Sequence, residues 1–372
     1  MKTTMIILLS LLFPPQDSLL VVSWNVENFL DYRTDTSGRH TAGRFYTKCN
    51  SVCKTLLLIA EQEGRLPDAV ALMEVGDRFV LERLVHSTPL RKLDYRIVHY
   101  ESPDRRGIDC ALLYRAGSLR LLRSRPVHLV DTTGLVMPTR DILVAEFDSL
   151  CILVNHHPSK VGADSERRRG IAMTRMNELM DSLAGFWRGA DGKSAGCWRG
   201  SEGSWRGSEG SWRGSEGSWR KSEGSWRGSE GSWRGSEGSW RGSEGSWRRS
   251  DFPAGTCATK VDSTLYDGAG IPSFFGPAPS SEVRPVLSVG DFNDDVWQAG
   301  GPGTIKYNGS WEKIDGHFAR GLTVREKVFA SPLLSEEDRT WGGTKPRRAF
   351  SGPRWLGGVS DHYPIILWIC RE

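Results

Sequence analysis

The sequence predicts a mixed α/β fold, with stacked sheets at its centre and helices covering the outer faces. Strand-like apolar runs outnumber the helical segments, and the helices fall between strands along the chain. Several of these runs are apolar on both faces, which is typical of strands buried between two layers. Together these observations fit a layered α/β domain.

The predicted elements follow the hydrophobic periodicity of the chain. A strand over 19–26 opens the domain, and the segment from Arg44 to Glu63 has helical spacing and ends at Gly64. A short helix is predicted over 79–85, and a long amphipathic helix is predicted over 163–183. The remaining strands are predicted over 69–74, 95–100, 108–114, 142–147, 151–155, 286–289 and 363–369, with one further segment near 313–318.

Two stretches of the 372-residue chain look separate from this domain. Residues 1–17 form an apolar leader, and residues 186–250 are low in complexity. Removing both leaves a single domain of residues 18–185 and 251–372, near the upper size of one domain. A hydrophobic content of 38% and a net charge of +4 suit a soluble enzyme and a polyanionic substrate, but they identify neither.

The first 17 residues have the pattern of a short secretory signal peptide. Lys2 precedes a mostly apolar run from Met5 to Phe13. This run is too short for a membrane-spanning helix, and we expect none in the chain. No small-x-small cleavage site follows it, so the alternative is an apolar extension packed on the domain. We favour a secreted or periplasmic protein, and a cytoplasmic one if the alternative holds.

The seven cysteines do not form a disulfide framework, because their number is odd and their spacing is scattered. Cys110, Cys151 and Cys370 lie within apolar runs and are expected to be buried as small hydrophobic residues. Cys49 and Cys53 are four residues apart in a predicted helix, and no second pair completes a zinc-binding pattern.

A seven-residue repeat, Trp-Arg-Gly-Ser-Glu-Gly-Ser, fills the chain from Trp198 to Arg248. The period does not indicate a coiled coil, because each unit has only one apolar residue and two helix-weakening glycines. We interpret 186–250 as a disordered insertion in a surface loop. The alternative, in which Trp and Arg stack on nucleic acid bases, stays open.

Polar side chains gather at the ends of three predicted strands. In SWNVEN the two-residue alternation places Asn25 and Glu27 on one face. Glu74 ends the apolar strand of VALMEV, and GDFND places Asp291 and Asn293 on one side of its strand. Carboxylate and amide oxygens are the ligands that Mg²⁺ or Mn²⁺ accepts.

Histidines follow at two further strand ends. His156 and His157 are adjacent, so in a strand they point to opposite faces and at most one can reach a shared site. Asp361 and His362 come just before the last strand, and Asp315 lies in an apolar setting. A carboxylate beside a histidine orients the imidazole and stabilises its charged form.

Each of these residues also has an ordinary structural interpretation. Asn25 could cap a turn, Glu74 could pair with an arginine, and Asp361 could bond to loop backbone. Asp109 is expected to pair with Arg105 or Arg106, and His157 is expected to be structural. Clusters at five strand ends nevertheless favour a functional site.

The order of these motifs resembles the endonuclease/exonuclease/phosphatase superfamily, whose members include deoxyribonuclease I. Within it, the sequences RGIDCALLY and YNGSWEKID are similar to those of bacterial extracytoplasmic members. The resemblance extends from about Leu19 to Ile369 with the repeat as an insertion, and implies a four-layer α/β/β/α sandwich. The motifs that carry it are, in order, SWNVEN, LMEV, NHHPS, GDFND, KID and SDHYP.

The resemblance also implies a divalent metal, Mg²⁺ with Mn²⁺ as a substitute. Glu74 would be its principal ligand, with Asn25 and Glu27 beside it. Asp361 would lie near the metal. Many relatives have a shorter Asp at the position of Glu27, which leaves its direct contact with the metal open.

Residue roles in catalysis follow from the same resemblance. Asp291 would orient or deprotonate the attacking water, and Asn293 would hold this water or a phosphate oxygen. His362 would donate to a non-bridging phosphate oxygen, and Asp315 would support His362.

Two further residues would contact the substrate phosphate in the family pattern. His156 stands where relatives have a Tyr or His at the phosphate, and Ser159 stands where they have a small polar residue.

Three functions remain open from the sequence. The first is a nuclease that cleaves phosphodiester bonds in nucleic acid, which the mildly basic net charge favours. The second is a phosphatase or phospholipase-like phosphodiesterase acting on a small or lipid phosphoester. The third is an inactive binding protein. We expect a monomer without a stable protein partner.

Overall fold

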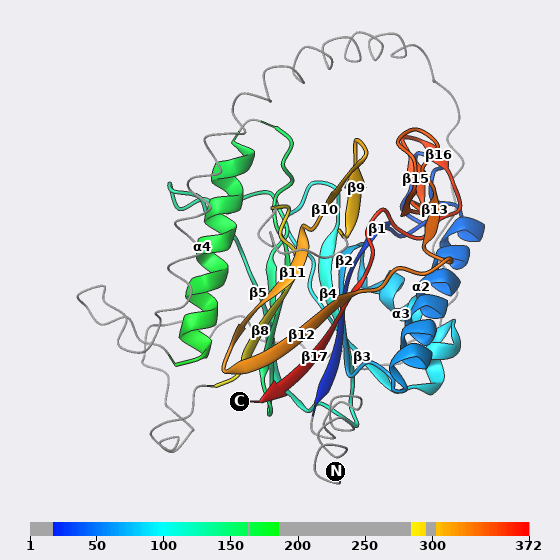
Figure 1. Ribbon diagram of the computed structural model, residues 1–372. Coiled ribbons are helices and arrows are strands. Elements are labelled where there is room, and N and C mark those ends of the chain that lie inside the picture. Colours follow the sequence, from blue (N-terminus) through cyan, green and yellow to red (C-terminus); the bar gives the residue numbers. More distant parts are fainter. Residues whose placement is uncertain (1–17, 163, 186–283, 295–302, 372) are drawn as a thin grey trace, which may run out of the picture. The chain divides into compact units, whose positions relative to one another are not determined.

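Two sheets stacked face to face form the centre of the fold (Figure 1). The structure is a computed structural model, and it describes residues 18–162, 164–185, 284–294 and 303–371. Leu287 and Val289 of one sheet pack against Val21 and Ile365 of the other in an apolar layer between the sheets. Burial of this layer stabilises the fold, together with the apolar layers beneath the helices.

The first sheet has six strands and the second has five. The order of the first is β12 (Leu322–Val328), β17 (Ile365–Arg371), β1 (Leu19–Phe29), β2 (Ala69–Val75), β4 (Asp109–Arg115) and β3 (Tyr95–His99). The order of the second is β11 (Asp315–Arg320), β8 (Val286–Asp291), β7 (Cys151–His156), β6 (Ile142–Phe147) and β5 (Leu121–Val127). The pairs β1–β2 and β7–β8 are parallel, and the other neighbours are antiparallel.

Helices cover both outer faces, as Figure 1 shows. Helices α2 (Ala42–Glu63) and α3 (Arg78–His86) pack on the six-stranded sheet through residues such as Leu56 and Leu84. Helix α4 (Ser165–Leu183) packs on the five-stranded sheet through Met176 and Met180. The expected four-layer α/β/β/α sandwich is therefore confirmed.

Among the described residues, four short elements lie outside the two large sheets and the three helices. They are the 3₁₀ helix η1 (Pro89–Lys92) and the hairpins β9–β10 (Ile305–Tyr307, Ser310–Glu312), β13–β14 (Ser335–Glu337, Thr344–Pro346) and β15–β16 (Phe350–Ser351, Arg354–Trp355).

Sequence periodicity missed two full strands, β5 and β12. Both lie at an edge of their sheet. The sequences LLRSRPV and LTVREKV carry charged residues, and most of their side chains are at least partly exposed. Edge strands have only one side to pair and often carry charges, so their apolar pattern is weak.

The predicted leader 1–17 and the insertion 186–250 lie outside the described residues. One of the two units into which the chain divides, Gly192–Ser281, also lies wholly outside them. In the described ranges, no helix combines the length and the apolar character that a bilayer crossing requires. The five cysteines in these ranges are free, and four of them are buried.

Gly290 is the residue at which the sheet tolerates no side chain. Its φ is 152°, and a Cβ there would lie 2.0 Å from the backbone oxygen of Asn155 on the neighbouring strand β7. Both backbones would have to separate to accept it, and the pairing that carries Asp291 would move with them.

We therefore predict that Gly290→Ala lowers the free energy of unfolding by at least about 2 kcal/mol in urea titration. Gly170→Ala is the matched control. Gly170 lies inside α4 with open space around the site of its Cβ, so this change should raise the free energy by about 0.5–1 kcal/mol. A Gly290→Ala protein as stable as the wild type would contradict the packing described.

Candidate active site

Asp291 lies where three strands of one sheet carry polar side chains side by side. It ends β8, and the register pairs it with His156 of β7 on one side and Asp315 of β11 on the other. Asn25 reaches it from β1 of the opposite sheet, with Nδ2 donating to Asp291 Oδ2 at 3.0 Å. The strand register of both sheets thus brings these residues to one place.

The Asp291 carboxylate is almost fully buried and fixed by hydrogen bonds. Its Oδ1 accepts from the backbone N–H of Asn293 at 2.9 Å. Its Oδ2 lies 3.7 Å from Nε2 of His156 and 3.9 Å from Nε2 of His362. Burial, and next the nearby Asp315 carboxylate, raise the pKa of Asp291 to about 7, which makes it a stronger base than an ordinary aspartate.

His362 is held by Asp315 and by its own backbone. Its Nδ1 lies 2.8 Å from Asp315 Oδ2, while its N–H donates to Ser360 Oγ at 3.0 Å. The indole Nε1 of Trp24 donates to its carbonyl oxygen at 3.0 Å. This arrangement leaves Nε2 directed toward Asp291.

The surroundings of His362 favour its protonated form. Burial alone would lower the pKa, but the carboxylates of Asp315, Asp291 and Asp361 outweigh it and hold the pKa well above the usual value. His156 behaves in the opposite way. Burial and the charges of Arg140 and Arg106 hold its pKa well below the usual value, so the site combines a cationic and a neutral imidazole.

Glu74 brings a second carboxylate to the site from β2. Its Oε2 accepts from the backbone N–H of Asn28 at 2.8 Å, and its Oε1 lies 3.8 Å from His156 Nε2. The strand register shifts between Met73 and Val75, and Glu74 itself has a φ of 61°. This bulge interrupts the regular alternation of side chains along β2 at Glu74.

Backbone strain concentrates around these residues. Four of the seven described non-glycine residues with positive φ are Glu27, Asn28, Glu74 and Asn293. Such conformations cost about 1–3 kcal/mol each and persist where the surroundings impose them. Their clustering here supports a functional rather than a purely structural role for the site.

Glu27 does not share a face with Asn25, although the alternation predicted it. The left-handed backbone at Glu27 and Asn28 breaks the period, and β1 shifts register beyond Asn25. The Glu27 carboxylate instead accepts the backbone N–H groups of Ala349 and Phe350, at 2.7 and 3.1 Å. Both of its oxygens are therefore engaged in holding a loop.

Arg348 and Lys48 lie beside the Glu27 and Asp361 carboxylates and offset their negative charge. Arg348 forms a 2.7 Å bond with Asp361 Oδ2, and its Nε lies 3.8 Å from Glu27 Oε1. The buried ammonium of Lys48 donates to the backbone oxygen of Glu27. Burial lowers the pKa of Lys48 to about 8, with Glu27 opposing this shift.

The structure separates some of the predicted residues from the cluster. Ser159 is exposed, and its carbonyl accepts from Arg169 on α4. Asn293 turns its Nδ2 to the carbonyl of His157 at 3.0 Å, while its backbone N–H holds Asp291. His157 points away from the site and packs its ring edge against Phe292, as the alternation of neighbouring histidines predicted.

Sequence reasoning missed Arg140, which holds the end of strand β7. Its buried guanidinium donates to the carbonyl oxygens of His156 and His157 and to Asp104 Oδ2. No motif marks it, because its partners are mostly backbone atoms and lie far away in the sequence. Trp24 and Ser360, which hold His362, were missed for the same reason, although both stand inside the motifs.

A divalent cation fits the donor atoms of this site. Glu74 Oε1 and Asp291 Oδ2 converge on the same nitrogen of a neutral His156, and Asp315 Oδ1 has no hydrogen-bond partner among the described residues. Oxygen atoms with excess negative charge are what Mg²⁺ and Mn²⁺ accept. Asn25 Oδ1 accepts one bond from Glu27 N–H and keeps a second lone pair.

Asp291, Asp315 and His362 also satisfy a geometric criterion for metal binding, since one ligand atom from each lies within 4.8 Å of the others. Within this trio, Asp315 Oδ2 and His362 Nδ1 already lie in hydrogen-bond contact at 2.8 Å.

Asp109 does not pair with Arg105 or Arg106, which corrects the sequence-based expectation. It accepts instead from the Ser102 backbone at 2.8 Å and lies 3.1 Å from His99 Nε2. His99 pairs with Ala111 across the β3–β4 ladder, two residues along the strand from Asp109 and on the same face, so the His99 ring reaches the carboxylate.

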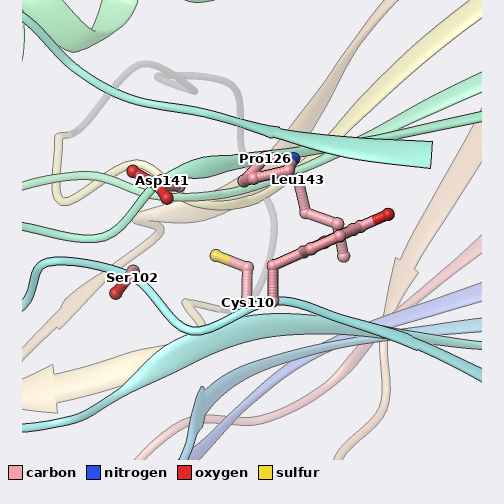
Figure 2. Close-up of a pocket in the computed structure, with 6 residues that line it drawn as sticks. Ser102, Cys110, Pro126, Asp141 and Leu143 are labelled. Carbon is pink, nitrogen blue, oxygen red and sulfur yellow. The ribbon is translucent and has the colours of Figure 1, made fainter. Parts of the chain in front are cut away.

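A cavity near this ladder is a packing feature rather than a substrate site. Figure 2 shows Ser102, Cys110 and Asp141 around it, with Pro126 and Leu143. Its volume of about 10 Å³ is sufficient for one water molecule at most. A phosphoester cannot enter it.

One protein family matches the chain. A model of the "Endonuclease/Exonuclease/phosphatase family" matches residues 21–190 and 298–371, which is more than half of the sequence. The segment with Asp291 and Asn293 falls between the two matched stretches. A search of curated proteins found no match.

Several solved structures have a chain trace similar to that of this protein. An endonuclease/exonuclease/phosphatase family protein from Bacteroides thetaiotaomicron is 12% identical with a TM-score of 0.47, covering 95% of this chain and 98% of its own. A mannosyl-6-phosphatase from the same organism is 12% identical with a TM-score of 0.45, covering 95% and 99%. The human nocturnin catalytic domain is 14% identical with a TM-score of 0.44, covering 96% of each.

We predict that His362 keeps its proton to a higher pH than an ordinary histidine because of Asp315. A raised pKa means that the proton is present below the folded-state pKa and is lost as the pH rises through it. Asp315→Asn removes the negative charge that raises the pKa of His362. NMR titration of the metal-free variant should therefore show His362 losing its proton at a lower pH than in the wild type.

Asp148→Asn is the control for this titration, because Asp148 pairs with Arg120 at the opposite end of β7 from His156. It should leave the titration of His362 unchanged. The same titration midpoint in the wild type and in Asp315→Asn would refute the assigned pairing.

Proposed function

Because this chain belongs to the endonuclease/exonuclease/phosphatase family of phosphoric ester hydrolases, we propose that it is a metal-dependent phosphodiesterase acting on nucleic acid. The observation that carries the proposal is the position of Asp291. This one buried carboxylate is bonded to Asn25 and lies within 4 Å of both His156 and His362.

Asp291 is proposed as the group that orients and deprotonates the attacking water. Its raised pKa brings it close to neutral pH, where a general base works best. The N–H groups of Asn25 and Asn293 fix the direction of its two oxygens. A water held by Asp291 would therefore approach the phosphorus from a defined side.

His362 is proposed as the donor to a non-bridging phosphate oxygen. Asp315 keeps it protonated and sets its ring orientation, so Nε2 carries the hydrogen that faces the site. A preorganised donor of this kind stabilises the charge that develops in the transition state. His156, neutral and buried, can act as a second donor to the phosphate.

Glu74 is proposed as the main holder of the metal, together with Asn25. When bound there, Mg²⁺ or Mn²⁺ would offset negative charge on the phosphate and on the leaving oxygen. Glu27 and Asp361 already have Arg348 as a partner. We therefore assign them to holding the loop before β17, beside the metal and not on it.

Exposed aromatic residues at the edge of the site support nucleic acid as the substrate. Trp311 and Tyr307 lie on the β9–β10 hairpin, where Ile305 bridges to His362. Trp341 packs on Gly309 in the same hairpin. These rings are 41%, 58% and 61% exposed, and a base can stack on such surfaces with about 1–3 kcal/mol of stabilisation. Figure 1 shows the hairpin at the upper end of the sheets.

A small or lipid phosphoester is the second candidate. The same hydrolytic groups would serve it, because the fold does not fix the substrate. An inactive binding protein is disfavoured by the strained backbone and the shifted pKa values, which have no structural benefit of their own.

The proposal predicts that the purified protein with Mg²⁺ cleaves plasmid DNA or RNA and hydrolyses bis-p-nitrophenyl phosphate. EDTA should stop the reaction and added Mg²⁺ or Mn²⁺ should restore it. Hydrolysis of p-nitrophenyl phosphate alone would select a phosphatase instead. No hydrolysis of any of these substrates with either metal would contradict the proposed activity.

Two variants separate the chemical step from substrate binding. Asp291→Asn should reduce kcat by roughly 10²- to 10⁴-fold while thermal unfolding stays close to that of the wild type. Trp311→Ala should raise KM for nucleic acid but leave the small diester unaffected. Equal losses on both substrates would remove the support that the aromatic residues give to nucleic acid.

A further inference from the structure

Helix α2 carries a lysine on the face that it buries against the six-stranded sheet. Lys48 is only 3% exposed. Figure 1 shows α2 on the outer face of this sheet, and the same face of the helix packs there with apolar side chains such as Phe45, Val52 and Leu56. An ammonium group is unfavourable in such surroundings unless it gains a polar partner.

The partner of Lys48 is the peptide unit that joins Glu27 to Asn28. The ammonium donates to the carbonyl oxygen of Glu27. The N–H of the same peptide unit belongs to Asn28 and donates to Glu74 Oε2 at 2.8 Å. One peptide unit therefore connects the lysine to a carboxylate of the candidate active site. Its carbonyl faces the cation and its N–H faces the anion, so each bond strengthens the other.

This peptide unit lies in an irregular part of strand β1. Glu27 and Asn28 have φ values of 48° and 47°, and the pairing of β1 with β2 shifts register between Asn25 and Phe29. Left-handed conformations of this kind persist where the surroundings impose them. The bond from Lys48 reaches the peptide from outside the sheet and supplies such a constraint.

The same arrangement orients the Glu74 carboxylate. Because the Asn28 N–H holds Oε2, the other oxygen stays directed into the site, where Oε1 lies 3.8 Å from His156 Nε2. The orientation of Glu74 thus depends on the peptide that Lys48 holds.

We propose that Lys48 is a positioning residue for metal binding, which holds the Glu74 carboxylate in place through the peptide unit between Glu27 and Asn28. The proposal rests on the function proposed above, in which Glu74 holds a divalent metal. Removing a group that orients a metal ligand costs about 10- to 100-fold in metal affinity.

A purely electrostatic role of Lys48 makes the opposite prediction. A cation beside a metal-binding carboxylate repels the metal, so removing its charge would tighten metal binding. A positioning role predicts weaker binding, because Glu74 loses its fixed orientation. The sign of the change in Mn²⁺ affinity therefore separates the two roles.

The test replaces Lys48 with methionine, a flexible unbranched side chain that fills similar space without the donor or the charge. In Lys48→Met, the dissociation constant of Mn²⁺ measured by calorimetry should rise by about 10-fold or more. In the metal-free variant, the Asn28 amide should exchange its hydrogen faster by NMR. Lys48→Arg restores a charged donor and should recover part of the affinity.

Lys54→Met is the matched control, because Lys54 is exposed on the same helix. It should change the dissociation constant of Mn²⁺ by less than about 3-fold, since salt screens an exposed charge. Exchange at the Asn28 amide should stay as in the wild type. Thermal unfolding of each variant excludes a folding defect.

Unchanged or tighter Mn²⁺ binding in Lys48→Met would overturn the proposal. Equally faster exchange at the Asn28 amide and at the Asn293 amide, which bonds to Asp291, would overturn it as well, because it would show a general loosening of the site. A wild-type protein that binds no Mn²⁺ would instead refute the proposed metal-dependent function. Exchange at Asn28 would then still decide whether Lys48 holds this peptide.

Discussion

The structure depends on the burial of one carboxylate at the meeting point of two sheets. Asp291 is only 2% exposed, so its charge must be compensated by neighbours, because an unpaired buried charge costs several kcal/mol. The positive charge of His362 and hydrogen bonds from the Asn25 side chain and the Asn293 backbone supply this compensation. Gly290 makes the approach of β8 to β7 possible, so fold and site share one constraint.

The charges of the site divide into two groups with different tasks. Arg348, Lys48 and Arg140 serve the scaffold, since they bond to Asp361, to the Glu27 backbone and to the end of β7. Glu74, Asp291 and His362 keep atoms directed into the site. This division explains why the site contains more carboxylates than a single metal requires.

Much of the fold and site could be predicted from the sequence, where the pattern is local. Apolar runs located the buried strands, and the ends of β2 and β8 located Glu74 and Asp291. Prediction failed where partners are distant or the backbone is irregular. The left-handed turn at Glu27 broke the alternation, and Arg140 bonds to carbonyl groups that leave no mark in a sequence. The exposed edge strands β5 and β12 lacked a clear apolar period.

The most direct test of the central claim is the position of a divalent cation. In a crystal soaked with Mn²⁺ and inorganic phosphate, anomalous diffraction should place the metal on Glu74, beside Asp291, with the phosphate next to His362. A metal found instead at the other group of candidate ligands, His99, Glu101 and Asp109, with Glu74 free, would contradict the account.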